Sequence, residues 1–209
     1  MANPSPETTR LVLVRHAVTA WNSEQRFQGH ADTPLSDEGR LTIPAVIAAL
    51  RPWAPAAVYT SDLSRAREMA EAAAVELELP LIATPELREC GYGAWEGLTL
   101  DEVRERDPEG LDEWRRRETI YARGGGESLA DMHERSWSYL ERVAADLAGR
   151  AAAFFTHSGP IRGVICRLFD LGLDQRYRFA VDNSSLTVLQ HTPGRGWQLL
   201  LLNQICHSV

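Results

Sequence analysis

The chain has 209 residues, 44% of them hydrophobic, and a formal net charge of −7 at pH 7. This length suits a single domain, spanning 1–209, with a substantial core. The acidic balance argues against a general nucleic-acid-binding protein, so no nucleic-acid partner is expected and any anionic ligand needs a local cluster of cations.

The cysteines and the N-terminal residues indicate the cellular compartment in which the protein is expected. Cys90, Cys166 and Cys206 are far apart and form no CxxC pair, so neither a disulfide framework nor a structural zinc site is expected. Residues 1–9 lack the apolar core of a signal peptide and are predicted to be a flexible tail. No apolar run approaches the roughly 18 residues that cross a bilayer. We therefore expect a cytoplasmic protein with no membrane partner.

Short aliphatic runs alternate along the chain with segments of helical spacing. The first, LVLV, is too short for a helix and is predicted to be a strand buried on both faces. Ser36, Ser61 and Ser128 are candidate N-caps of helices that follow. The predicted strands are residues 11–14, 57–60, 81–84 and 152–156, and a terminal hairpin of 184–190 and 196–203. The predicted helices cover about 36–51, 61–77, 128–149 and 161–171. This order predicts an α/β fold, a three-layer αβα sandwich with a mixed, mostly parallel sheet.

The segment from about 89 to 127 differs in composition from the rest. It combines aromatic residues with an RRR run and a GGG run. We predict an inserted, lid-like segment of short helices and loops over one edge of the domain. Trp95 and Trp114 either line an apolar part of a substrate pocket or pack the segment onto the domain, and packing is the commoner role for such side chains.

Polar residues follow three of the predicted strands. Arg15 and His16 come directly after the first, Arg65 lies just beyond the second, and His157 follows the fourth. Each alone has an ordinary explanation as a solvated loop, a surface helix residue or a helix cap. If these strands are parallel, however, their carboxyl ends share the edge where open α/β folds bind ligands. Two arginines and two histidines beside helix N-termini would form a phosphate site there.

Several motifs resemble those of the histidine phosphatase superfamily, also called the phosphoglycerate-mutase-like family. They are RHAVTAWNSEQRFQGHADTPLSDEGR, YTSDLSRARE, LRECGYGAWEG, GGGESLADMHER and FFTHSGPIRGV, in the family's order. Together they extend from Leu11 to the terminal hairpin. The chain departs from the family at Ala17, which replaces the glycine of the RHG motif. A methyl group there would crowd the pocket or restrict the backbone if the position required a positive φ.

The resemblance implies a mechanism that needs no metal and no other cofactor. His16 would attack phosphorus and form a phosphohistidine, since neutral imidazole is a good nucleophile near pH 7. Arg15 and Arg65 would hold the phosphoryl oxygens with the planar fork that lysine lacks. His157 and Asn22 would add donors that stabilise the transferring charge.

The resemblance also supplies an acid. Glu89 matches the family's acid position and would protonate the leaving oxygen, then take a proton from the attacking water. This requires it to be protonated part of the time near neutral pH, through partial burial that offsets the nearby cations. Taken alone, it would be an ordinary surface carboxylate, as Glu96 is expected to be. Gln28 and Gly29 are expected to line the pocket mouth, and Ser158 to add a backbone or hydroxyl contact.

Four functions remain open within the family: a phosphatase of small molecules, a cofactor-dependent phosphoglycerate mutase, a phosphate-binding module without catalysis and a phosphatase of phosphohistidine proteins. A phosphatase acting on a small phosphorylated substrate is favoured, because ECGYGAWEG lacks the arginine and histidine that follow the acid in cofactor-dependent phosphoglycerate mutases. Ala17 is the only feature that supports a phosphate-binding module without catalysis. A phosphatase of phosphohistidine proteins would need an open site, whereas the 89–127 segment is predicted to cover the site in part. The individual phosphomonoester is not predicted, and the oligomeric state is left open, with a homodimer as one option.

Overall fold

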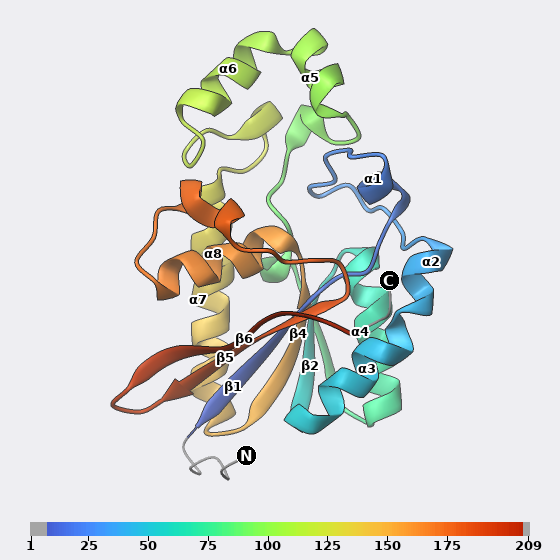
Figure 1. The fold of residues 1–209 in the computed structure, drawn as a ribbon, viewed down its shortest axis with the longest axis vertical. Coiled ribbons are helices and arrows are strands. Elements are labelled where there is room, and N and C mark those ends of the chain that lie inside the picture. Colours follow the sequence, from blue (N-terminus) through green and yellow to red (C-terminus); the bar gives the residue numbers. More distant parts are fainter. Residues whose placement is uncertain (1–7, 207–209) are drawn as a thin grey trace.

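The computed structural model describes residues 8–206, which fold around one six-stranded sheet (Figure 1). The strand order is β3-β2-β4-β1-β5-β6. The first four strands in that order are mutually parallel, β5 runs antiparallel to β1, and β6 runs antiparallel to β5. The strands are β1 (Thr9–Arg15), β2 (Pro55–Ser61), β3 (Leu81–Thr84), β4 (Ala151–Thr156), β5 (Ser185–Thr192) and β6 (Gly196–Ile205). The predicted mixed, mostly parallel sheet is confirmed.

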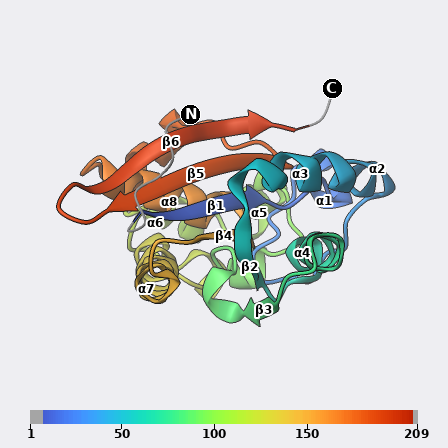
Figure 2. The same cartoon turned by 90° about the horizontal axis from the view of Figure 1, so that it is seen from below.

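Helices cover both faces of the sheet, which confirms the three-layer sandwich. The covering helices are α3 (Ile43–Leu50), α4 (Ser64–Leu77), α7 (Leu129–Leu147) and α8 (Ser158–Leu168). Figure 2 shows α3 and α4 on one side of the sheet, and α7 and α8 on the other. Val12 and Val14 belong to the core on the α3–α4 side, whereas Leu11 and Leu13 belong to the core on the α7–α8 side. An uninterrupted aliphatic run is what a strand covered on both faces requires.

The strand register brings three loops to one edge. β1 pairs with β4 so that Arg15 lies opposite Thr156, and β4 pairs with β2 so that Phe155 lies opposite Thr60. The residue after each strand therefore emerges at the same edge. His16 is one of these, and its backbone N–H donates to the Thr156 carbonyl at 3.0 Å. This is the meeting of strand ends that the sequence predicted.

Shorter helices lie mainly beyond this edge and around it. They are α1 (Ala20–Ser23), α2 (Asp37–Leu41), α5 (Leu100–Arg106) and α6 (Pro108–Arg116), with the 3₁₀ turns η1 (Arg51–Trp53), η2 (Pro85–Leu87), η3 (Gly93–Trp95), η4 (Arg123–Gly125) and η5 (Leu173–Arg178). Figure 1 shows α5 and α6 above the carboxyl ends of the strands. No helix within residues 8–206 combines the length and apolar character needed to cross a membrane.

The two tryptophans of the 89–127 segment pack against each other. Trp95 is 1% exposed and donates its indole N–H to the Asp107 carboxylate at 2.7 Å. Its ring meets that of Trp114 edge to face, with centroids 6.2 Å apart. Both side chains belong to a small apolar cluster with Val103 and Leu111. They therefore hold the segment together, and Trp95 also meets Phe27 outside it, with ring centroids 5.9 Å apart.

Three details of the predicted elements are corrected. β1 begins at Thr9, which pairs with His191, so this residue belongs to the sheet rather than to the predicted tail; residues 1–7 of that tail lie outside the described part of the chain. The helix predicted over 36–51 is two helices that meet at Thr42, one residue before α3, whose second residue is a proline. Ser61 ends β2 and does not cap α4, whose N-cap is Leu63.

Candidate active site

A polar pocket of about 150 Å³ opens at the carboxyl edge of the sheet. It is lined by Arg15, His16, Asn22, Arg26, Phe27, Gln28, Gly29, Arg65, Glu89, Tyr92 and Ser158. The structure thus brings together the predicted site residues; His157 is not on the wall, but its ring centroid lies 5.1 Å from that of His16. A larger groove of about 760 Å³ between α3 and α4 is mainly apolar, and two of its charged groups, Arg51 and Glu76, pair with each other.

The surroundings of His16 fix which ring nitrogen is free. Its Nδ1 lies 2.7 Å from the carbonyl oxygen of Ala17. Because a carbonyl only accepts, Nδ1 carries the hydrogen and Nε2 keeps its lone pair. Burial, followed by the charges of Arg65 and Arg15, holds the pKa of His16 well below the ordinary value of 6.5. The ring is therefore a neutral nucleophile at pH 7.

A segment just before β5 holds the backbone around His16. The Asn183 amide donates to the carbonyls of His16 and Ala17 at 2.9 and 3.2 Å. The backbone N–H of Ser184 donates to the Arg15 carbonyl at 3.2 Å. Sequence reasoning missed these residues because the partner of the terminal hairpin was not identified. Pairing it antiparallel with the first strand would have placed the start of β5 beside the end of β1.

Two arginines flank His16, a half-buried Arg15 and a buried Arg65. Arg15 donates from Nη1 to the Val181 carbonyl at 2.7 Å. Arg65, 0% exposed, donates to the carbonyls of Ala31 and Gly29, both at 2.8 Å. The Nε atom of each guanidinium is buried and has no hydrogen-bond partner within residues 8–206. Burial lowers the pKa of both, that of Arg65 to about 10, so both are cations at neutral pH.

His157 presents a donor next to the His16 ring. Its Nε2 lies 3.0 Å from the Ser61 hydroxyl, which accepts the backbone N–H of Leu63 at 3.3 Å. The hydroxyl hydrogen is therefore free to point at Nε2. Burial, then the charges of Arg65 and other nearby cations, hold the pKa of His157 well below 6.5, so the ring is neutral. In the tautomer in which the Ser61 hydroxyl donates to Nε2, the ring hydrogen is on Nδ1. That atom is buried without a partner in the described chain.

Glu89 enters the pocket from a loop and reaches the start of α8. The side chain is buried, with 8% exposure. Its Oε2 accepts from the Ser158 hydroxyl at 3.2 Å and from the Gly159 backbone at 3.1 Å, and Oε1 accepts from the Cys90 backbone at 2.9 Å. A Cβ on Gly159 would overlap Oε1, so this close approach requires glycine. The first turn of α8 thus orients the carboxylate.

The predicted mouth residues also line the pocket. Asn22 uses Oδ1 to accept the backbone N–H of Thr19 at 3.0 Å, which closes the capping box of α1. Gln28 is 8% exposed. Gly29 has φ of 53°, and a side chain there would overlap Glu96. The Glu96 carboxylate accepts the backbone N–H of His30 at 2.7 Å and so anchors this loop. Glu96 is therefore a structural anchor and not the ordinary surface carboxylate that was expected.

The sequence as a whole matches the histidine phosphatase superfamily (branch 1) over residues 11–205. The chain belongs to this superfamily. A Bacillus stearothermophilus protein of known structure superposes with a TM-score of 0.84 at 30% identity, over 92% of this chain and 96% of that one.

Named relatives include phosphatases. Phosphoserine phosphatase 1 of Hydrogenobacter thermophilus is 31% identical over 198 residues, which cover 95% of this chain and 93% of that protein. Metal-independent phosphoserine phosphatase of Arabidopsis thaliana is 34% identical over 165 residues, covering 78% and 69%. The chain spans about half the length, 54%, of a bifunctional Mycobacterium tuberculosis protein to which it is 32% identical. The chain is thus a hydrolase, a phosphatase of the histidine phosphatase type.

Ala17, which replaces the superfamily's motif glycine, fits without strain. Its backbone lies outside the left-handed region, so no glycine is required. The residue is fully buried in the core of the α3–α4 face, and its N–H lies 3.0 Å from the Met69 sulfur. It does not line the pocket. The expected crowding of the histidine phosphatase site is therefore not found.

Three pocket residues were not predicted. Phe27 and Tyr92 meet edge to face, with ring centroids 5.2 Å apart, and form an aromatic wall. Arg26 is paired with the carboxylates of Glu24 and Glu102, each at 2.7 Å. Phe27 and Tyr92 lie within three residues of predicted site residues in sequence, which is the only signal that marked them.

Proposed function

We propose that the chain is a metal-independent phosphatase that hydrolyses small phosphomonoesters through a phosphohistidine on His16, with Glu89 as the proton donor. One observation carries the proposal. Three buried donors, Arg15 Nε, Arg65 Nε and His157 Nδ1, have no partner in residues 8–206 and belong to side chains gathered around His16. Unpaired buried donors are costly. A phosphoryl group would satisfy them with its three non-bridging oxygens.

In the first step, His16 Nε2 attacks phosphorus and the bond between phosphorus and the ester oxygen breaks. The Ala17 carbonyl holds the tautomer that leaves Nε2 unprotonated. The arginines and His157 stabilise the charge that spreads over the transferring oxygens. Glu89 gives its proton to the leaving oxygen, so the product departs as an alcohol.

In the second step, Glu89 takes a proton from water, and the oxygen of that water attacks the phosphohistidine. The bond between phosphorus and Nε2 breaks, inorganic phosphate forms, and both side chains return to their starting states. Ser158 and Gly159 hold the carboxylate in place through both proton transfers. The positive charge that a metal would otherwise supply comes from the two arginines, and the Arabidopsis relative described as metal-independent supports this reading.

The walls of the pocket favour a small substrate. A volume of about 150 Å³ accepts a phosphoryl group and a short leaving group, which would lie against Phe27 and Tyr92. Arg26, the remaining arginine of the wall, is neutralised by two carboxylates, so the site offers little charge for a second phosphate. The names of the phosphoserine phosphatase relatives support the same size of substrate.

A panel of phosphomonoesters assayed with a metal chelator tests the proposal. It includes phosphoserine, 3-phosphoglycerate and p-nitrophenyl phosphate. We expect inorganic phosphate as the product, at rates that chelation leaves unchanged and that His16→Ala abolishes. Efficient isomerisation of phosphoglycerate with a bisphosphate primer would instead establish a mutase. Phosphate binding without turnover of any substrate would establish a binding module.

A further inference from the structure

Glu89, the residue proposed as the acid, lies on a loop outside the helices and strands. Glu89 lies between η2, which ends at Leu87, and η3, which begins at Gly93. Within residues 8–206, no strand pairs with the residues between these turns, unlike those that precede His16 and His157. A carboxylate on such a loop needs other contacts to keep its position during proton transfer.

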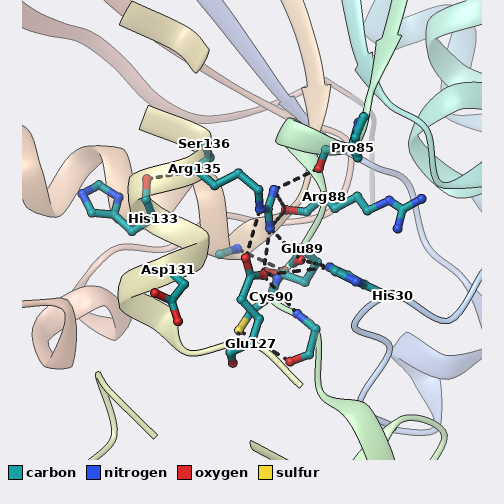
Figure 3. A network of polar contacts seen from close by, with 12 residues as sticks. His30, Pro85, Arg88, Glu89, Cys90, Glu127, Asp131, His133, Arg135 and Ser136 are labelled. Carbon is teal, nitrogen blue, oxygen red and sulfur yellow. Dashed lines mark hydrogen bonds and ion pairs between the residues drawn. The ribbon is translucent and has the colours of Figure 1, made fainter. Parts of the chain in front are cut away.

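Arg135 of α7 supplies contacts along this loop, as Figure 3 shows. Its guanidinium donates to the carbonyls of Pro85 at 3.0 Å, Glu86 at 2.7 Å, Arg88 at 3.3 Å and Glu89 at 3.4 Å. One side chain therefore binds carbonyls of the η2 turn and of the two residues that follow it. Only a planar group with several donors can do this, and a lysine cannot.

Glu127 fixes the direction of the Arg135 fork. Its two carboxylate oxygens accept from Nε at 3.0 Å and from Nη2 at 2.8 Å, a bidentate pair in which the side chains are 20% and 19% exposed. The backbone of Glu127 also donates to the Gly91 carbonyl at 2.8 Å. A second side chain, that of His30, also contacts the loop, with Nε2 2.9 Å from the Glu89 carbonyl oxygen. The loop is thus held before and after Glu89.

On the basis of the proposed function, we propose that Arg135, oriented by Glu127, is the positioning residue for Glu89. Arg135 does not line the pocket and touches no reacting atom. It holds the Glu89 carbonyl, while the carboxylate of the same residue accepts from Ser158 and Gly159. Without the Arg135 side chain, the loop would sample other positions and the rate of proton donation by Glu89 would fall. The phosphate site at the strand ends would stay intact.

Leaving-group dependence tests this role. The kcat/KM values of wild type, Arg135→Lys and Arg135→Gln are measured with an alkyl phosphate, whose leaving oxygen needs a proton, and with p-nitrophenyl phosphate, whose leaving oxygen does not. We expect kcat/KM for the alkyl ester to fall about 10- to 100-fold in both variants. For the aryl ester we expect less than about a 3-fold change. Glu127→Gln should give a smaller loss of the same selectivity.

Arg142→Gln is the matched control, since Arg142 is an exposed arginine on the same helix whose guanidinium lies over the Tyr139 ring. It should leave both substrates unaffected. An equal loss with both esters in an Arg135 variant whose thermal unfolding matches that of wild type would overturn the positioning role, as would no loss with either. The aryl ester also reports on folding, since a misfolded variant loses both activities. Failure of wild type to hydrolyse any ester would overturn the proposed function instead.

Discussion

His16 and His157 each follow directly from a strand of the sheet, and the pairing of β1 with β4 sets their separation before any side chain is considered. Glu89, across the pocket, lies on a loop whose position depends on side chains from α7 and on His30. We call Arg15, His16, Arg65 and His157, which lie at or just beyond the ends of β1, β2 and β4, the strand-borne half of the site. Glu89 and its loop form the loop-borne half, which carries the acid. Phosphate capture and proton supply therefore rest on different parts of the fold, and each can be weakened alone.

The largest effect is expected from His16→Ala in the strand-borne half. Removing the nucleophile should lower kcat/KM by about 10⁴-fold or more with any phosphomonoester. Phosphate release assays measure this loss. His191→Ala, at a histidine on β5 outside the pocket, is the control and should retain activity. Comparable residual activity in the two variants would mean that another group attacks phosphorus.

Arg65→Lys should follow, with a loss of about 10²- to 10³-fold. Lysine keeps the charge but cannot bond the Gly29 and Ala31 carbonyls while also presenting a donor to the phosphoryl group. Because the phosphoryl group is common to all substrates, alkyl and aryl esters should suffer equally. A loss confined to alkyl esters would place Arg65 on the acid side of the pocket.

Glu89→Gln should separate the two halves. The amide keeps the shape of the carboxylate but supplies no proton, so we expect kcat/KM for an alkyl ester to fall about 100-fold and that for p-nitrophenyl phosphate only a few-fold. A plot of log kcat/KM against leaving-group pKa should steepen relative to wild type. A parallel line would show that Glu89 does not protonate the leaving group.

Stability should depend on pH through the buried histidines. The pKa values of His16 and His157 are lowered by burial, so below pH 6.5 the unfolded chain binds protons that the native chain does not. The free energy of unfolding should therefore fall with decreasing pH, by about 1.4 kcal/mol per unit for each histidine until its native pKa is reached. Urea unfolding from pH 7.5 to 5.0 measures this slope. His16→Gln should remove the contribution of one histidine to the slope of unfolding free energy against pH. An unchanged slope in this variant would refute the contribution assigned to His16.

The smallest effect is expected at Ala17, whose side chain lies outside both halves. Ala17→Gly would restore the superfamily's motif residue, yet Ala17 is unstrained and buried away from the pocket. Activity should change less than about 2-fold, while loss of a buried methyl group and added backbone freedom should destabilise the fold by about 1 kcal/mol. Steady-state kinetics and thermal unfolding test the two parts. A large gain in activity would show that the methyl group impairs catalysis.

The sequence could predict the strand-borne half because local rules place it. An aliphatic run that ends in Arg15 and His16 identifies a strand and the edge at which its side chains emerge. No local sequence rule predicts the position of Glu89 and its loop. Arg135 is 46 residues from Glu89 in sequence, and its role depends on the docking of α7 against the loop. Asn183 was missed for a similar reason, since its contact with His16 requires the pairing of β5 with β1.

The covalent step is the central claim, and rapid acid-free quenching of wild type with a ³²P-labelled phosphomonoester tests it most directly. We expect a transient label that is stable to alkali, labile to acid and located on the peptide that contains His16; His16→Ala should show none. Label on a different residue, or turnover with no labelled protein at any time point, would contradict the account.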